Sequence, residues 1–384
     1  MTMDYQDQVE ELLDQASVLP EGPSKLALLE EAVRLADAHR DVALGDEMRE
    51  AVIQTATFSG YPEKALVAFS WRLAQADRAP EQFPETELMW AYKWIVDSLA
   101  SFPQITRQQI EDAFDDMTQR FQRCGYGMRS IYKLRWDAAL DMGEADEARR
   151  YYRLWEKTSH DANSDCLACE QDSRVLYHVF FNKHEKAVQT ADPIVNGSLA
   201  CATVPERTYG RVLLPLLRLG QVEKAAEYYR KGYRLIRANR KYLNYLGDYL
   251  IFLGLTGNLS QGVKLFEKHL EYVLETMDLI ARWRFHLAAR FFLPLVAESG
   301  QSSLKLRLPK TTPGYREAGR YDVSALASAV EETCRELAAQ FDARNGNDSF
   351  VRTLAAQHRL KRWVTPYPLQ RSKIPKRHDG GDDE

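Results

Sequence analysis

The sequence predicts an all-α fold, an α-solenoid of stacked antiparallel helix pairs, and two observations support this. Apolar residues recur at helical spacing along almost the whole chain. Turn-forming residues separate the helical segments, and these are Gly60, Gly143, Asn182, Gly220 and Gly257. They are spaced by 83, 39, 38 and 37 residues, and the first interval covers about two repeats. A period of this length is typical of solenoids built from helix pairs.

The elements follow in order from the N-terminus. Residues 1–41 are expected to form N-terminal capping helices, with a break at 20–23 and Ser24 as the cap of the second helix. Residues 42–300 are expected to hold the repeats. In the first part of this region, Thr106 and Gln109 have the spacing of a capping box. The clearest predicted pairs are 127–142 with 144–158, 167–181 with 184–192, 205–219 with 222–238, and 242–256 with 259–275.

The regular pattern ends after Gly300. Residues 301–322 are basic and contain Pro and Gly, so an inserted loop is predicted there. Residues 323–363 are predicted to be C-terminal capping helices, and residues 364–384 to be a disordered tail.

The repeat register resembles a known family. When Gly220 is placed between two helices, Tyr209, Leu213 and Leu216 fall on the first helix, and Ala225, Tyr229 and Gly232 on the second. A small residue at 225 allows close approach of the backbones, and the aromatic residue at 229 fills the adjacent space. This pattern is similar to the tetratricopeptide repeat (TPR). The resemblance covers about 40–300 and implies a right-handed superhelix that binds other proteins.

A narrower resemblance concerns the cysteines. The string Ser164-Asp-Cys166-Leu-Ala-Cys169, followed by Cys201, Pro205 and the segment 213–220, is similar to bacterial TPR proteins that carry the same three cysteines. This resemblance implies a scaffold or interaction role and supports joint action of the three cysteines.

The repeat register also predicts that these cysteines meet. Cys166 and Cys169 lie in the connection that enters one repeat, and Cys201 lies in the connection that enters the next repeat. Equivalent connections of stacked helices are about 10 Å apart, so the side chains can converge. Three or four cysteine and histidine ligands are typical of structural zinc. We therefore predict a structural zinc that fastens one repeat to the next.

His160, six residues before Cys166 in the same polar connection, is the first candidate for a fourth ligand. Asp165, His184 and Cys124 are further candidates. Two alternatives to a metal site are open: ordinary packed thiols, and a redox pair formed by the C-x-x-C motif. Cys334, on the apolar side of a predicted helix, is assigned to packing.

The sequence gives little support for enzymatic catalysis. The motifs of phosphate-binding loops, dinucleotide-binding folds and common hydrolases are absent, and the eight histidines are scattered. We therefore expect no enzymatic activity and no small-molecule substrate.

The formal net charge is -4, the start of the chain is acidic and polar, and no apolar stretch is long enough to cross a bilayer. These features predict a cytoplasmic protein without a membrane partner.

The predicted partner is another protein or a peptide. Some TPR proteins hold a C-terminal carboxylate with Lys and Asn on successive first helices, but here the one lysine, Lys133, faces Asp137. The predicted groove along 205–256 is mainly apolar and suits an amphipathic helix or an extended apolar peptide. The chain's own C-terminal helices are an alternative occupant. The residues predicted to line the groove are Leu214, Leu217 and Ile251, with Arg207 and Arg211 at its edge.

Two functions other than a protein-binding scaffold are also compatible with the sequence. One is a peptide-responsive regulator, in which a ligand changes the pitch of the superhelix. The other is a nucleic-acid-binding protein that uses the basic tail, since residues 359–377 carry seven Lys and Arg side chains and no acid. Solubilisation is a simpler role for such a tail, so nucleic acid is not the partner we favour.

Overall fold

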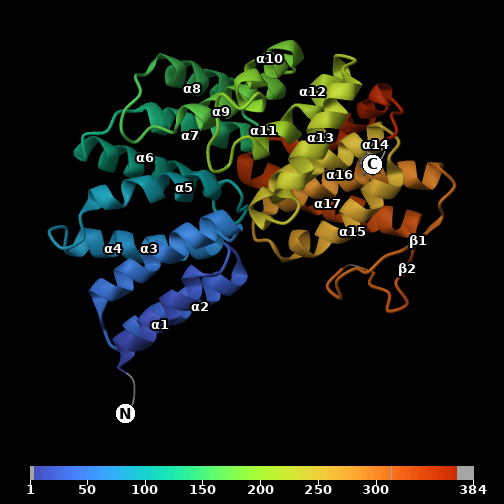
Figure 1. Ribbon diagram of the computed structural model, residues 1–384. Coiled ribbons are helices and arrows are strands. Elements are labelled where there is room, and N and C mark those ends of the chain that lie inside the picture. Colours follow the sequence, from blue (N-terminus) through green and yellow to red (C-terminus); the bar gives the residue numbers. More distant parts are fainter. Residues whose placement is uncertain (1–3, 313, 370–384) are drawn as a thin grey trace, which may run out of the picture.

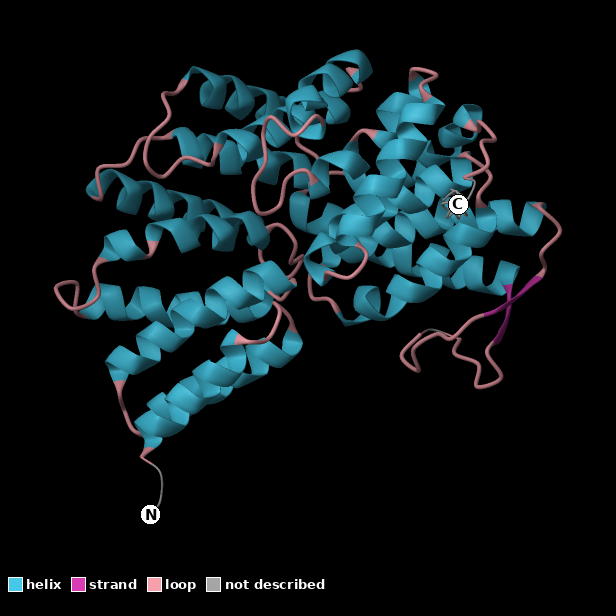
Figure 2. Cartoon of the chain, viewed as in Figure 1, coloured by secondary structure: helices cyan, strands magenta, loops and turns pink. Residues whose placement is uncertain are grey.

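In the computed structural model, residues 4–312 and 314–369 are described, and most of them lie in α-helices (Figures 1 and 2). The helices rise from α1 near the N-terminus along one side of an arch, cross its top, and fill a bulkier C-terminal half (Figure 1). In the described part of the chain, no helix is both long and apolar enough to span a bilayer.

The helices of the N-terminal half are α1 (Tyr5–Ser17), α2 (Pro23–Ala38), α3 (Val42–Ser59), α4 (Pro62–Arg78), the 3-10 helix η1 (Glu85–Glu87), α5 (Met89–Leu99), α6 (Arg107–Arg123), α7 (Arg129–Asp141), α8 (Ala145–Lys157), α9 (Leu167–Phe180) and α10 (His184–Val195). The elements that follow are α11 (Glu206–Arg211), α12 (Leu213–Arg218), α13 (Val222–Ile236), η2 (Arg240–Tyr242), α14 (Leu243–Leu255), α15 (Leu259–Glu275), α16 (Leu279–Glu298), β1 (Ser303–Lys305), β2 (Arg320–Asp322), α17 (Val323–Asn345), α18 (Ser349–Ala356) and η3 (Gln357–Trp363).

The recurring turn residues all adopt the left-handed backbone conformation. Asn182 has φ 54°. The four glycines have φ between 71° and 78°, and they are Gly60, Gly143, Gly220 and Gly257. Each follows the end of one helix and precedes the next. Glycine adopts this conformation without steric cost, and asparagine is among the residues that tolerate it. The turn signal read from the sequence is therefore confirmed.

Local sequence also determines how individual helices begin and break. The predicted capping box of α6 is confirmed, because the Thr106 hydroxyl accepts a hydrogen bond from the backbone of Gln109 while the Gln109 side chain accepts one from the backbone of Thr106. The helix predicted over 205–219 is instead divided into α11 and α12. Pro215 has no N–H and cannot donate the helical hydrogen bond to the carbonyl of Arg211.

Neighbouring helices pack together along the chain. First helices of successive pairs also contact one another: α5 contacts α7, α11 contacts α14, and α14 contacts α16.

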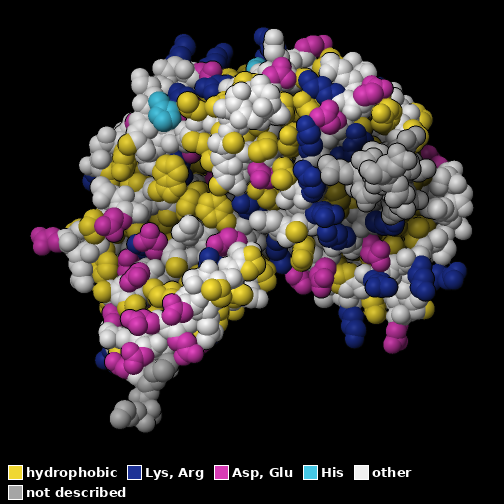
Figure 3. All heavy atoms as spheres, viewed as in Figure 1, with side chains coloured by type: hydrophobic (Ala, Val, Ile, Leu, Met, Phe, Trp, Pro, Cys, Tyr) yellow, Lys and Arg dark blue, Asp and Glu magenta, His cyan; other side chains and the backbone are white. Residues whose placement is uncertain are grey.

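The C-terminal half of the chain also contacts the N-terminal half. The backbone N–H of Leu279 donates to Ser101, the Arg344 guanidinium donates to the carbonyl of Ala100, and Arg284 forms an ion pair of 2.7 Å with Asp141. The arch is therefore closed on one side, and a notch separates its lower ends (Figure 3).

The segment predicted as an inserted loop contains two short strands. β1 and β2 pair antiparallel, with Ser303 opposite Asp322 and Lys305 opposite Arg320. Leu306 and Tyr321 are buried and join the main apolar core, which extends from α9 to α17. A second core fills the N-terminal half between α1 and α7.

The start of the predicted tail lies against α14. Thr365 and Tyr367 donate backbone hydrogen bonds of 2.8 and 3.0 Å to the carbonyls of Leu255 and Thr256. Leu369 donates to the side chain of Asn258 over 3.0 Å. The rest of the basic tail, residues 370–384, lies outside the described residues.

Candidate metal centre

Two connections bring three cysteines together. Cys166 is the N-cap of α9, Cys169 lies in the first turn of that helix, and Cys201 lies in the connection between α10 and α11. Their sulfur atoms all lie within 4.8 Å of one another. In a tetrahedral zinc site, Zn–S bonds of about 2.3 Å place the sulfurs about 3.8 Å apart. The three cysteines therefore lie close enough together to hold one metal ion.

The local backbone explains why the sulfurs converge. Cys166 has the extended conformation that N-cap residues adopt, with φ -64° and ψ 158°, and three residues later Cys169 lies on the same side of the helix. Cys201 is held in a tight turn by two backbone hydrogen bonds with Val204, of 2.9 and 3.3 Å. Val204 is fully buried beside Ala168, so the turn is packed directly against the first turn of α9.

The connection before Cys166 is tied to α5 and α7. Asp165 pairs with Lys93 at 2.7 Å and with Lys133 at 3.4 Å. The carbonyl of Asn163 accepts hydrogen bonds from Lys93 and from the Ser130 hydroxyl. Partners beyond the ligands fix ligand positions in metal sites. These contacts therefore hold Cys166 in place without a metal.

The thiols differ in their electrostatic surroundings. Burial raises the pKa of Cys166, but hydrogen bonds from the backbone of Cys169 and from the other two thiols outweigh this effect, and the net pKa is lowered. Burial raises the pKa of Cys169 to about 12, although the positive charge of Arg207 acts to lower it. A metal ion binds thiolates, so binding would release protons and strengthen with rising pH.

The predicted fourth ligand, His160, is not part of this cluster. Among the residues that the structure describes, the group of closely placed ligand atoms contains only the three cysteines. The His160 Nε2 atom lies 2.9 Å from the carbonyl oxygen of Asp165, where it can act as a donor. Both residues belong to the connection that leads to Cys166.

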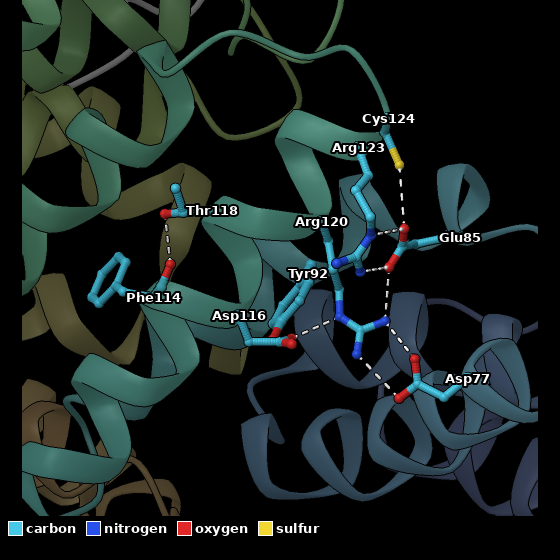
Figure 4. A network of polar contacts seen from close by, with 9 residues as sticks. All are labelled: Asp77, Glu85, Tyr92, Phe114, Asp116, Thr118, Arg120, Arg123 and Cys124. Atoms are coloured by element: carbon cyan, nitrogen blue, oxygen red, sulfur yellow. Dashed lines mark hydrogen bonds and ion pairs between the residues drawn. The ribbon is translucent and has the colours of Figure 1, made fainter.

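The three weaker candidates are also engaged elsewhere. The Asp165 carboxylate is occupied by two lysines, and the His184 Nε2 atom lies 2.9 Å from an Arg218 nitrogen. Cys124 directs its thiol toward Glu85, with 3.8 Å between Sγ and Oε2 (Figure 4). It belongs to a network around Arg120 that joins α4, η1 and α6 (Figure 4).

The residues predicted to bind a partner lie in α11, α12 and α14. Arg207 and Arg211 lie 3.3 and 3.4 Å from Asp172 of α9. Leu214 and Ile251 are half-buried, and Leu217 is buried in the main core. The three apolar side chains thus pack partly or wholly within the fold.

Sequence reasoning missed a set of charged residues beside these positions. Asp97 of α5, Asp248 of α14 and Arg284 of α16 were not selected. Their common signal is their position on the first helices of predicted pairs. That signal alone does not separate them from an ordinary charged face.

A scan of the chain against protein-family models finds no matching family, and a search of curated proteins finds no match.

Proposed function

We propose that this protein is a non-catalytic, TPR-type interaction scaffold that binds a segment of a partner protein and contains one structural zinc at Cys166, Cys169 and Cys201. The observation that carries this proposal is the convergence of sulfurs from two consecutive connections within 4.8 Å. A metal at this position would join the pair that begins with α9 to the pair that begins with α11.

Three arguments favour a structural over a catalytic metal. The sulfurs lie at connections of a helical stack, where a metal crosslinks adjacent repeats. Zinc with several thiolates is the usual composition of structural sites. The two carboxylates next to the cysteines in the chain are both engaged, since Asp165 pairs with Lys93 and Lys133 and Glu170 pairs with Arg129 at 2.7 Å.

Elemental analysis of the purified protein tests the metal. We expect one zinc per chain in the wild type and in Cys124→Ser, which alters a half-buried thiol outside the cluster. Cys166→Ser is expected to lose the zinc and to melt several degrees lower, because a metal that binds only the folded state stabilises it. Absence of metal from the wild type, or equal zinc in both variants, would contradict the proposal.

The scaffold role needs a separate test. Affinity capture with the wild type should recover a partner protein, and the partner should be lost when Cys166→Ser releases the metal and loosens the stack. Turnover of a small molecule by the purified protein would contradict the non-catalytic role.

A further inference from the structure

An open cavity lies between α15 and the segment that connects α16 to α17. Figure 1 shows this segment at the lower right, extending past α15. The cavity has a volume of about 950 Å³, and its walls are one face of α15 and residues 305–308 and 315–319 of the connecting segment. We name it the α15 pocket. Its volume is within the range of small-molecule sites, about 300–1,000 Å³.

The wall that the connecting segment contributes is fixed to the rest of the fold. Leu306 and Leu308 are buried in the main apolar core. The backbone N–H of Arg307 donates a hydrogen bond of 2.7 Å to the carboxylate of Glu267 on α15. The backbone N–H of Leu306 donates one of 2.8 Å to the carbonyl of Gly319, which joins the two ends of the wall. These contacts hold the segment at a defined distance from α15.

Five cationic side chains line the pocket, and all of them are exposed: Lys264, Lys268, Lys305, Arg307 and Arg316. Among the described residues, none forms an ion pair or a hydrogen bond with any of these five side chains. Lys and Arg side chains gather over this part of the surface (Figure 3). An anion could therefore bind here without displacing a carboxylate.

The electrostatics of the pocket are positive but not uniformly so. Burial lowers the pKa of Lys268, and the positive charge of Arg237 at the end of α13 lowers it further. Three carboxylates also line the pocket, those of Glu267, Glu271 and Glu317. Five positive charges against three negative charges leave a formal excess of two positive charges. Because Glu267 is engaged by the backbone of Arg307, the carboxylates that oppose an anion are the other two.

We propose that the α15 pocket binds a small molecule that carries several phosphate groups. The guanidinium groups of Arg307 and Arg316 match phosphate oxygens in a bidentate geometry, and lysines add point charges. A single phosphate would fill only a small part of a cavity of this volume, whereas a chain of phosphates can meet cations on both walls. A nucleic-acid strand needs cations along a track of several nucleotides, but these five surround one hollow. The inference goes beyond the scaffold function and does not depend on the zinc.

Two sources of such a ligand share this chemistry: inorganic polyphosphate and a nucleotide. Tyr315 distinguishes them, because its ring lines the pocket, is 36% exposed and can stack on a base. For a nucleotide, Tyr315→Leu should weaken the binding of ATP and leave that of tripolyphosphate unchanged. For inorganic polyphosphate, the two probes should bind equally well and Tyr315→Leu should affect neither.

Isothermal titration calorimetry of the full chain at low salt, with tripolyphosphate and with ATP, tests the proposal. We expect one molecule of at least one probe per chain. Arg307→Gln with Arg316→Gln should lower the affinity about tenfold or more. Glu271→Gln with Glu317→Gln should raise it, because the two opposing carboxylates are removed.

The matched control is Arg40→Gln with Arg78→Gln. It removes the same charge from two exposed positions in the N-terminal half and should leave the affinity unchanged. The melting temperature and the zinc content of all these variants should equal those of the wild type, since the substituted pocket side chains hold no other residue in place. A loss of binding is thereby separated from a failure of the fold or of the metal centre.

Four outcomes would overturn the inference. The first is that neither probe binds the wild type. The second is that the control pair weakens binding as much as the change of Arg307 and Arg316. The third is that removal of Glu271 and Glu317 lowers the affinity. The fourth is that a single-stranded oligothymidylate binds more tightly than either probe, which would indicate a nucleic-acid strand instead of a small molecule.

Discussion

The Nζ atom of Lys93 lies 2.7 Å from Oδ1 of Asp165, the residue that immediately precedes Cys166. Lys93 is 4% exposed and belongs to α5, so this pair ties the cysteine connection to an earlier repeat. Lys133 and Lys93 together hold the pKa of the Asp165 carboxyl below its usual range, even though burial acts to raise it. The ion pair and the candidate metal centre are therefore parts of one structural unit.

Asp165→Asn should consequently affect both stability and metal affinity. Loss of the carboxylate leaves Lys93 buried without its ionic partner, and breaking a buried pair costs about 3–5 kcal/mol. Weaker positioning of Cys166 should reduce metal affinity about 10–100-fold. Urea unfolding and competition with a metal chelator measure the two effects. Asp146→Asn, at an exposed site, is the control, and an unchanged metal affinity in Asp165→Asn would refute the coupling.

Gly262→Ala should destabilise the fold, although alanine stands at the equivalent position in four other repeats. A Cβ atom at 262 would lie 2.2 Å from Cε2 of Phe292, whose ring is fully buried in α16. Overpacking of this kind costs about 1–3 kcal/mol. Chemical denaturation measures the change, and the added substitution Phe292→Leu should restore part of the loss. No rescue by that second substitution would contradict the steric explanation.

His269 should make the protein sensitive to mild acid. The side chain is 1% exposed, its Nε2 atom lies 3.1 Å from the Tyr233 hydroxyl, and burial lowers its pKa to about 3. The folded pKa lies below the unfolded value of about 6.5, so this contribution to stability is present above pH 6.5 and is lost as the pH falls toward 3. The loss should be about 1.4 kcal/mol per pH unit.

Urea unfolding between pH 7 and pH 4.5 checks this expectation by comparison of variants. His269→Gln should show a shallower fall in the free energy of unfolding than the wild type. His358→Gln, at an exposed histidine, should show the wild-type slope. Equal slopes for all three proteins would show that His269 does not remain neutral in the folded state.

Much of the local architecture could be predicted because it depends on neighbours in sequence. Positive φ at Gly220 and Asn182 follows from residue type at a helix end, and the meeting of Cys169 with Cys201 follows from the repeat register. The antiparallel strands of the 301–322 segment were missed because each has only three residues, and an alternation as short as Ser303-Leu304-Lys305 or Arg320-Tyr321-Asp322 does not predict a strand.

Contacts between distant repeats could not be predicted in the same way. The pair of Arg284 with Asp141 spans 143 residues and depends on how far the stack curves before its ends meet. Sequence periodicity gives the order of the helices but not this curvature.

The network around Arg120 provides a final prediction, on the rigidity of the N-terminal repeats. Arg120 of α6 is 7% exposed and lies 2.7 Å from Asp77 of α4, 2.8 Å from Glu85 of η1 and 2.7 Å from Asp116 of its own helix (Figure 4). A lysine at this position carries the same charge but lacks the planar fork that reaches three carboxylates at once. Arg120→Lys should therefore cost about 2 kcal/mol, since hydrogen bonds between charged groups contribute about 1.5–3 kcal/mol each.

Arg123→Lys is the matched comparison, because Arg123 contacts the same Glu85 carboxylate from a side chain that is 56% exposed. Exposed ion pairs contribute about 0–1 kcal/mol, so this variant should differ little from the wild type. Urea unfolding of the two variants side by side measures the difference. Equal and small effects would mean that α4 and α6 are held together by their apolar contacts with α5, and that the arginine network adds specificity of position without adding stability.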